Sequence, residues 1–287
     1  MTASATIDLG GVTVDRVVEM EFPFATVPQL FVDVSDEEVA PHRAALEPWA
    51  LDPESGRLII AVQSYLVRTL HHTILIDTCV GCEKTSTFLP AWHMRRDRSW
   101  LDRLAAAGVQ PEAVDFVMCT HLHSDHCGWN TQRIDGRWAP TFPNARYVMT
   151  RREVEAAEAR GAAQWEESIA PVIAAGQALL VDGDHALDDQ VRFEPTPGHT
   201  PGHVAVGLAG TTRQAVMCGD LIHSPIQCAQ PDWRYRNDAD PQEALRTRRA
   251  FLEAGSESGR LVLTAHFPAP SMGRVVTEGE AFGFEFV

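Results

Sequence analysis

The sequence predicts a mixed α/β fold, because strand-like and helix-like segments alternate in both halves of the chain. Apolar runs of strand length recur, such as RLIIAVQSYLVRT at residues 57–69. Helical segments with capping residues lie between these runs. Several of the expected strands are followed directly by histidine or aspartate. Since open α/β sheets carry their sites at the carboxyl ends of strands, these residues mark the expected position of the site.

The composition excludes several classes of protein. The chain has 287 residues, of which 45% are hydrophobic and 22% are charged, as in an ordinary globular protein. A net charge of −15 argues against nucleic-acid partners and disfavours strongly anionic substrates. The sequence has neither a signal-peptide pattern nor an apolar stretch of membrane-spanning length. We therefore expect one cytoplasmic domain over residues 1–287, without a nucleic-acid or membrane partner.

The N-terminal part combines an extended segment with a less regular one. Residues 1–21 predict an opening strand, whereas residues 22–56 are rich in proline and acidic residues and predict irregular structure. This second segment is expected to be a lid or dimerisation arm, which suggests a homodimer, or else a packed surface extension. Residues 57–69 and 72–78 predict a strand pair, and residues 114–119 predict a buried strand.

The remaining elements continue the alternation. Thr150 and Glu153 form the pattern of a capping box, which marks the start of a helix. The expected helices cover residues 98–107, 151–160, 162–175 and 241–254. The expected strands cover residues 145–149, 189–194, 203–208, 214–218 and 260–264.

The stretch HLHSDH at residues 121–126 directly follows the strand expected at 114–119. Three imidazoles and a carboxylate crowded together lose solvation, and this loss requires a compensating partner. A divalent metal ion is such a partner, since neutral imidazole and carboxylate are usual ligands of zinc and related ions. The stretch therefore predicts a metal-binding loop.

Three further candidates follow other expected strands, and together with the loop they make a dinuclear set. His121 and His123 are two positions apart, so both can point to the same side of an extended loop. With His199 they are expected to hold one ion. A second ion is expected between Asp125, His126 and His266, with Asp220 bridging the two. The candidate metal ligands are His121, His123, Asp125, His126, His199, Asp220 and His266.

The six cysteines do not form a disulfide scaffold. Cys79 and Cys82 are spaced as CxxC, but the chain offers no second pair and no thioredoxin-like context. A turn of small residues after a strand is the favoured interpretation, and a disulfide between the two thiols is left open.

The HLHSDH loop, the GH of TPGHTPGH, the GD of CGDL and the AH of TAHFP resemble the metallo-β-lactamase fold superfamily. Later runs, including GDLIHSPIQ and LVLTAHFPAPSMGRV, resemble the branch that contains methyl parathion hydrolase and its lactonase relatives. The similarity covers roughly residues 57–286. It implies a four-layer αββα sandwich with the site at one edge between the sheets. It also implies that Asp77 orients a ligand histidine.

The implied activity is that of a metal-dependent hydrolase. A hydroxide bridging two divalent ions would attack a neutral ester or lactone, with promiscuous action on organophosphate triesters. Zinc is the expected metal, although manganese, iron and cobalt suit the same ligands. Asp125 is expected to pass a proton to the leaving group. His223 stands where acyl-homoserine lactonases often carry a tyrosine, and it is expected to donate a hydrogen bond to the substrate carbonyl.

Two alternatives remain open within the same superfamily. One is a thioesterase of the glyoxalase II type, although the acidic and apolar tail GEAFGFEFV lacks a basic patch for glutathione. The other is a mononuclear-iron persulfide dioxygenase, which keeps a similar histidine-rich loop. Trp92, Trp100 and Trp129 are expected either to line an apolar pocket or to pack in the core.

Overall fold

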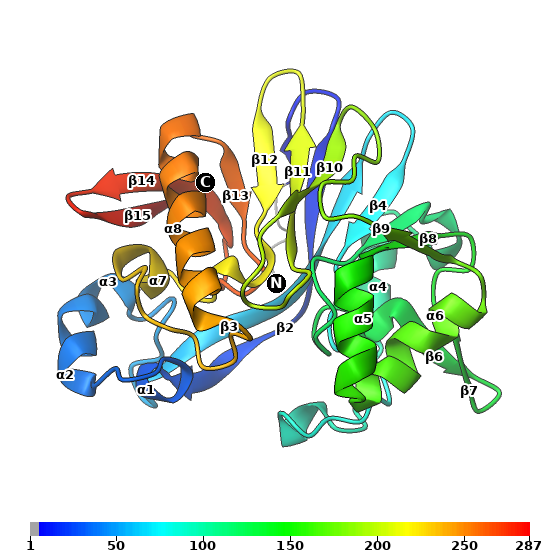
Figure 1. The fold of residues 1–287 in the computed structure, drawn as a ribbon, viewed down its shortest axis with the longest axis horizontal. Coiled ribbons are helices and arrows are strands. Elements are labelled where there is room, and N and C mark those ends of the chain that lie inside the picture. Colours follow the sequence, from blue (N-terminus) through cyan, green and yellow to red (C-terminus); the bar gives the residue numbers. More distant parts are fainter. Residues whose placement is uncertain (1–5) are drawn as a thin grey trace.

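Two β-sheets form the centre of the computed structural model, which describes residues 6–287 (Figure 1). The first sheet contains, in spatial order, β1 (Ile7–Asp8), β2 (Thr13–Thr26), β3 (Arg57–Arg68), β4 (Thr73–Ile76), β5 (Phe116–Met118), β8 (Arg146–Thr150) and β9 (Ala178–Val181). The second contains β10 (Val191–Pro195), β11 (Val204–Ala209), β12 (Gln214–Met217), β13 (Leu261–Leu263), β14 (Met272–Glu278) and β15 (Ala281–Phe286). A separate hairpin joins β6 (Thr131–Ile134) to β7 (Arg137–Pro140).

Helices cover the outer face of each sheet. The first sheet is covered by α4 (Ser99–Ala106), α5 (Arg151–Arg160) and α6 (Ala170–Ala174). The second is covered by α7 (Ile226–Ala229) and α8 (Pro241–Ser258). Figure 1 shows α4–α6 gathered on one side of the strands and α8 on the other. The predicted four-layer αββα sandwich is confirmed.

A core to which both sheets contribute lies between them. Ile74 and Ile76 of β4 face it from the first sheet, and Val204 and Val206 of β11 face it from the second. Their spacing of two follows from the alternation of side chains along a strand. Burial of each such aliphatic side chain stabilises the fold by about 1.5–3 kcal/mol. This core fixes the position of one sheet relative to the other, so that strand ends from both sheets meet at one edge.

The segment at residues 22–56 is more regular than predicted. β2 continues past Pro23 to Thr26, and the chain then forms α1 (Val27–Leu30), α2 (Asp36–Val39) and α3 (Arg43–Leu46). The proline is tolerated because β1 pairs with only the first residues of β2, so that the rest of β2 has a partner on one side only. A register shift between Pro23 and Ala25 accommodates the ring.

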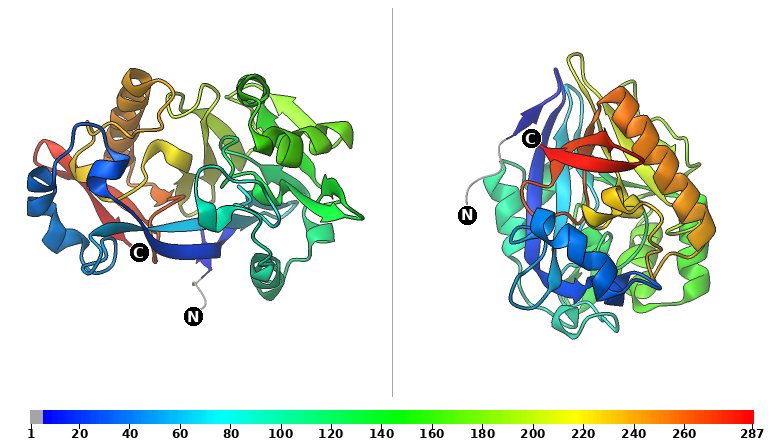
Figure 2. Two further views of the ribbon diagram at one scale, coloured as in Figure 1. Left: turned by 90° about the horizontal axis from the view of Figure 1, so that it is seen from below. Right: turned by 90° about the vertical axis from the view of Figure 1, so that its left-hand side faces the viewer.

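This N-terminal segment packs against the C-terminal half of the chain. Phe31 forms an isolated β-bridge with Tyr235, and the rings of Trp49 and Phe286 are 4.7 Å apart. Figure 2 shows the three short helices beside the C-terminal strands. The segment is therefore a packed extension in this structure, and its role as a lid or dimerisation arm stays a prediction.

The other expected elements agree with the structure within a few residues, with two exceptions. The helix predicted at 162–175 is a π-helical turn at Trp165–Ile169 followed by α6. The hairpin β6–β7 and the strands β9, β14 and β15 were not predicted from the sequence. No helix within residues 6–287 is long and apolar enough to cross a membrane.

Candidate metal centre

The structure brings all seven predicted ligands together where strands of both sheets end. The HLHSDH loop follows β5 of the first sheet. His199, Asp220 and His266 follow β10, β12 and β13 of the second sheet. Residues distant in sequence therefore meet at one edge because the sheets are docked face to face. Their ligand atoms fall into two groups, named site A and site B below.

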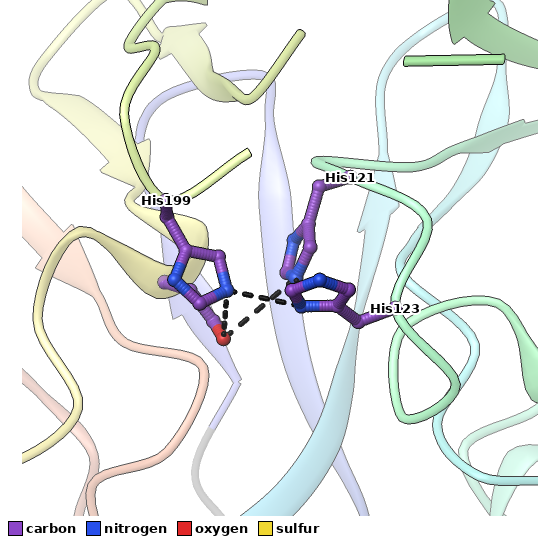
Figure 3. Close-up of side chains that lie close together, drawn as sticks. His121, His123 and His199 are labelled. Atoms are coloured by element: carbon purple, nitrogen blue, oxygen red, sulfur yellow. Dashed lines mark hydrogen bonds and ion pairs between the residues drawn. The ribbon is translucent and has the colours of Figure 1, made fainter. Parts of the chain in front are cut away.

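Site A consists of His121, His123, His199 and Asp220, whose ligand atoms all lie within 4.8 Å of one another. His123 Nδ1 is 3.1 Å from His121 Nε2 and 3.0 Å from His199 Nε2. Asp220 Oδ2 lies 3.2 Å from His199 Nε2. Figure 3 shows the three imidazoles converging from two separate loops. This is the group predicted for the first ion.

Site B consists of Asp125, His126 and His266, together with the second oxygen of Asp220. Asp220 Oδ1 is 3.1 Å from His126 Nε2 and 3.0 Å from His266 Nε2. Asp125 Oδ2 is 3.8 Å from each of these nitrogens. Asp220 thus presents Oδ2 to site A and Oδ1 to site B, which is the arrangement of a bridging carboxylate.

The donor set fits two divalent cations. His126 Nε2 and Asp220 Oδ1 are fully buried and lie 3.1 Å apart, yet neither makes a hydrogen bond of good geometry to any group among residues 6–287. A buried polar atom without a partner costs about 1–3 kcal/mol, so the pair requires another group. Five imidazoles and two carboxylates match the nitrogen and oxygen ligands that zinc prefers. A metal ion in each site would satisfy these atoms.

Hydrogen bonds to the ring nitrogens that do not face the sites orient two of the ligand histidines. Asp77 Oδ2 is 2.8 Å from His126 Nδ1, which is the contact expected from the sequence. Such partners fix the tautomer and the ring orientation of a metal ligand. Asp238 does the same for His199, with a distance of 3.0 Å to Nδ1. Asp238 was not identified as a site residue from the sequence, because it lies in a loop 39 residues after His199 and no spacing connects the two.

Glu153 braces the two loops that carry most of site A. Its buried carboxylate accepts hydrogen bonds from the backbone N–H groups of Leu122 at 3.1 Å and Gly202 at 3.0 Å. Thr150 caps α5 as predicted, by accepting from the Glu153 N–H. The reciprocal half of the capping box is replaced, because the Glu153 side chain turns toward the site loops.

Burial and the surrounding charges shift the pKa values of the candidate ligands in different directions. Burial, reinforced by neighbouring histidines, holds the pKa of His121 and His123 well below the usual value, so both imidazoles are neutral. Burial also lowers the pKa of His199, but the carboxylates of Asp220 and Asp238 outweigh it and raise the pKa to about 9. Burial raises the pKa of Asp220, and the surrounding histidines reverse this and keep it well below the usual range. Metal binding must therefore displace protons from part of the site.

His223 lies against site A but makes different contacts from those of the ligands. Its Nε2 is 3.2 Å from Asp220 Oδ2, and its ring stacks on Tyr235 with centroids 3.6 Å apart. Gln227 Oε1 accepts the His223 backbone N–H at 2.6 Å and lies 3.3 Å from Nδ1. Each ring nitrogen therefore faces an acceptor oxygen, and a proton on Nε2 points toward Asp220 and the site. Tyr235 was not identified from the sequence.

The turn at residues 79–82 supports the metal-binding loop through its backbone. Gly128 N–H donates to the Cys79 carbonyl at 2.8 Å. A Cβ at Gly128 would lie 1.8 Å from the Val80 carbonyl oxygen, so only glycine permits this approach. Cys79 and Cys82 are both free thiols. The structure thus agrees with the interpretation of this segment as a tight turn.

A cavity of about 400 Å³ opens onto both sites. One wall is apolar and comes from the N-terminal segment, β3 and the loop at residues 83–98. Trp92 belongs to this wall, whereas Trp100 and Trp129 stack on each other in the core with centroids 5.7 Å apart. The apolar wall contains Phe24, Leu30, Ile60, Phe88 and Trp92, and the polar side includes Arg160, Gln164, Tyr235 and Asn237.

A buried lysine anchors the loop that carries Phe88 and Trp92. Lys84 Nζ donates to Thr131 Oγ1 at 2.6 Å and to the Glu167 carbonyl at 2.7 Å. It also lies 3.7 Å from the ring centroid of Trp138. Burial nevertheless lowers the pKa of Lys84 to about 7. The loop is fixed at its base, while Phe88 at its tip is half exposed.

The fold and the site together define the class of protein. The chain belongs to the Metallo-beta-lactamase superfamily, whose family model matches residues 59–266. An N-acyl homoserine lactonase from a Bacillus species is 29% identical over 161 residues, which are 52% of this chain and 58% of that protein. The chain thus spans less than two thirds of the length of this curated relative.

Two solved structures resemble the whole chain. The hydrolase AbOPH of the beta lactamase superfamily is 25% identical, with a TM-score of 0.83, and the match covers 100% of this chain and 98% of AbOPH. The dizinc quorum-quenching lactonase AidC is 21% identical, with a TM-score of 0.78 and coverage of 99% and 97%. At this identity the likeness to AidC concerns the fold.

Proposed function

We propose that this protein is a dinuclear metal-dependent hydrolase that cleaves a neutral lactone or ester. The observation that carries the proposal is the position of Asp220, which faces site A with one carboxylate oxygen and site B with the other. A closed structural zinc site needs four ligands around one ion and has no use for such a bridge. The adjoining cavity gives a substrate access to both sites.

The seven predicted ligands would hold two divalent ions, with zinc as the expected metal. When bound, such ions supply hydroxide at neutral pH and polarise a carbonyl or phosphoryl oxygen. Asp125 lies in the cavity wall, and its carboxylate would accept a proton and pass it to the leaving alkoxide. With its proton on Nε2, neutral His223 would donate a hydrogen bond to the substrate oxygen.

The cavity favours substrates with an apolar arm. Phe24, Phe88 and Trp92 form a row of aromatic contacts. The ring centroid of Phe88 lies 5.9 Å from that of Phe24 and 5.6 Å from that of Trp92. Rings arranged in this way bury an acyl, alkyl or aryl group. The lactonase activity named for the Bacillus relative supports a lactone as the reacting group. Neutral organophosphate triesters are proposed as promiscuous substrates.

One experiment tests the proposal against its alternatives. Purified protein is analysed for metal and then assayed with a lactone panel, aryl esters, a neutral phosphotriester, a glutathione thioester and a persulfide. We expect about two equivalents of metal and hydrolysis of lactones or esters, with turnover lost in His123→Ala. His71→Ala, at an exposed turn, is the control. One equivalent of iron with oxygen uptake on persulfide, or thioester cleavage alone, would overturn it.

A further inference from the structure

Arg248 is a buried cation that connects several parts of the site on the second sheet. It projects from α8 and is 1% exposed. Its Nε donates to the Leu221 carbonyl at 2.9 Å, directly after the bridging Asp220. Its Nη1 donates to the carbonyls of Pro231 and Trp233 at 3.0 and 3.1 Å. These contacts fix the start of the loop that carries Tyr235 and Asp238.

The fourth contact of Arg248 leads to a candidate metal ligand. Nη2 donates to Asp238 Oδ2 at 3.2 Å, and the other oxygen of Asp238 lies 3.0 Å from His199 Nδ1. The backbones of the same two segments are also joined, since Ala239 N–H donates to the His199 carbonyl at 3.0 Å. A continuous chain of hydrogen bonds therefore extends from the guanidinium through the carboxylate to the imidazole of site A.

Site B does not depend on the hydrogen bonds that connect Arg248, Asp238 and His199. Its histidines are oriented by Asp77, at 2.8 Å from His126, and by the Ala61 carbonyl, at 2.8 Å from His266. Ala61 lies in β3 and Asp77 directly follows β4, so both groups are positioned by the first sheet. Asp220 is shared by the two sites, but its backbone has a second support because its N–H donates to His203 Nε2 at 3.0 Å. The contacts of Arg248 thus act mainly on His199.

We propose that Arg248 is a positioning residue that selectively sets the metal affinity of site A through Asp238 and His199. The inference rests on the proposed function in one respect, namely that both sites bind metal. Outer partners of metal-ligating histidines typically contribute 10- to 100-fold to metal affinity. Lysine cannot replace arginine here, because one ammonium cannot reach four acceptors that a planar guanidinium contacts in different directions.

The test is a competitive titration of metal-free protein with zinc against a chromophoric chelator, which resolves the two binding steps without any activity assay. We expect Arg248→Met to weaken one step about 10- to 100-fold and to leave the other within about threefold. Cobalt spectra of the half-loaded variant should retain the bands of site B alone. Arg248→Lys should restore only part of the loss. Arg246→Met is the matched control, since Arg246 is exposed on the same helix.

Asp238→Asn covers the case in which Arg248→Met does not fold, because it preserves the size of the side chain while removing the charge and replacing one acceptor oxygen by an NH₂ group. It should weaken the same single step. Equal weakening of both steps, or none, in the variants that fold would overturn the inference. Wild-type protein that binds two ions without hydrolysing any substrate would refute the proposed function alone. Wild-type protein that binds no metal would overturn both.

Discussion

Replacement of Asp77 by asparagine should weaken site B far more than site A. Asp77 is fully buried, and its carboxylate accepts from the Thr120 N–H at 2.8 Å, from Thr120 Oγ1 at 2.9 Å and from His126 Nδ1 at 2.8 Å. An amide has one acceptor oxygen and one NH₂ group. In Asp77→Asn the NH₂ group must therefore face either the Thr120 N–H or the protonated Nδ1 of His126.

The magnitude follows from the contacts that are lost. A hydrogen bond to a charged group contributes about 1.5–3 kcal/mol, which corresponds to roughly 10- to 100-fold in the affinity of site B. A smaller loss is expected at site A, because Thr120 Oγ1 lies 3.1 Å from His121 Nδ1. Burial lowers the pKa of His126, but the carboxylates of Asp220, Asp125 and Asp77 outweigh it and raise that pKa well above the usual value.

The pKa of His126 gives the prediction a pH dependence. In wild-type protein, metal must displace a firmly held proton from His126, and Asp77→Asn weakens this competition. The loss of affinity should therefore be larger at pH 8 than at pH 6. Competitive metal titration at both values measures it, with Asp102→Asn on the exposed face of α4 as the control. Unchanged affinity at site B at pH 8 would refute the role assigned to Asp77.

Three further predictions concern stability. Lys84 has a folded-state pKa of about 7, lower than in the unfolded chain, so the free energy of unfolding should rise with pH between about 7 and 10 as the unfolded chain binds the extra proton. In Lys84→Met, the free energy of unfolding measured in urea should rise by a few kcal/mol less over this pH range than in the wild type. Parallel pH profiles for the two proteins would contradict the lowered pKa of Lys84. Gly128→Ala should destabilise the fold by about 3 kcal/mol, because the Cβ meets the Val80 carbonyl, whereas Gly183→Ala meets only ordinary contacts; equal melting temperatures would show that the turn yields. Removal of metal by a chelator should lower the melting temperature, since each ion present at 100 times its Kd contributes about 2.7 kcal/mol. Calorimetry with and without added zinc checks this.

The candidate ligands could be found from the sequence because each is marked locally. The HLHSDH loop has a characteristic spacing, and His199, Asp220 and His266 each follow an apolar run that forms a strand. The strand periodicity also predicted the centres of both sheets. The local pattern of apolar residues was sufficient to predict a strand wherever the side chains on a sheet face are buried.

Apart from Asp77, the residues that support the ligands could not be found in this way. Asp238 lies in a loop, and Glu153 and Arg248 lie on helices, where a charged residue ordinarily indicates a solvated face. Their burial depends on loops that meet only after the sheets dock. The strand beyond Phe22 was missed because Pro23 usually ends a strand, and only the short partner strand β1 explains why it does not here.

Each site takes ligands from both sheets, and this has a consequence for the order of assembly. Neither sheet alone can surround an ion, and His266 follows β13, which is hydrogen-bonded between β12 and β14. A nascent chain that ends before β13 therefore lacks site B, however well its first sheet has formed. Capture of the site B ion is confined to the final stage of folding, and a bound ion then acts as a crosslink between the two halves of the sandwich. Slow metal release would keep those halves together even under conditions that loosen the core between them.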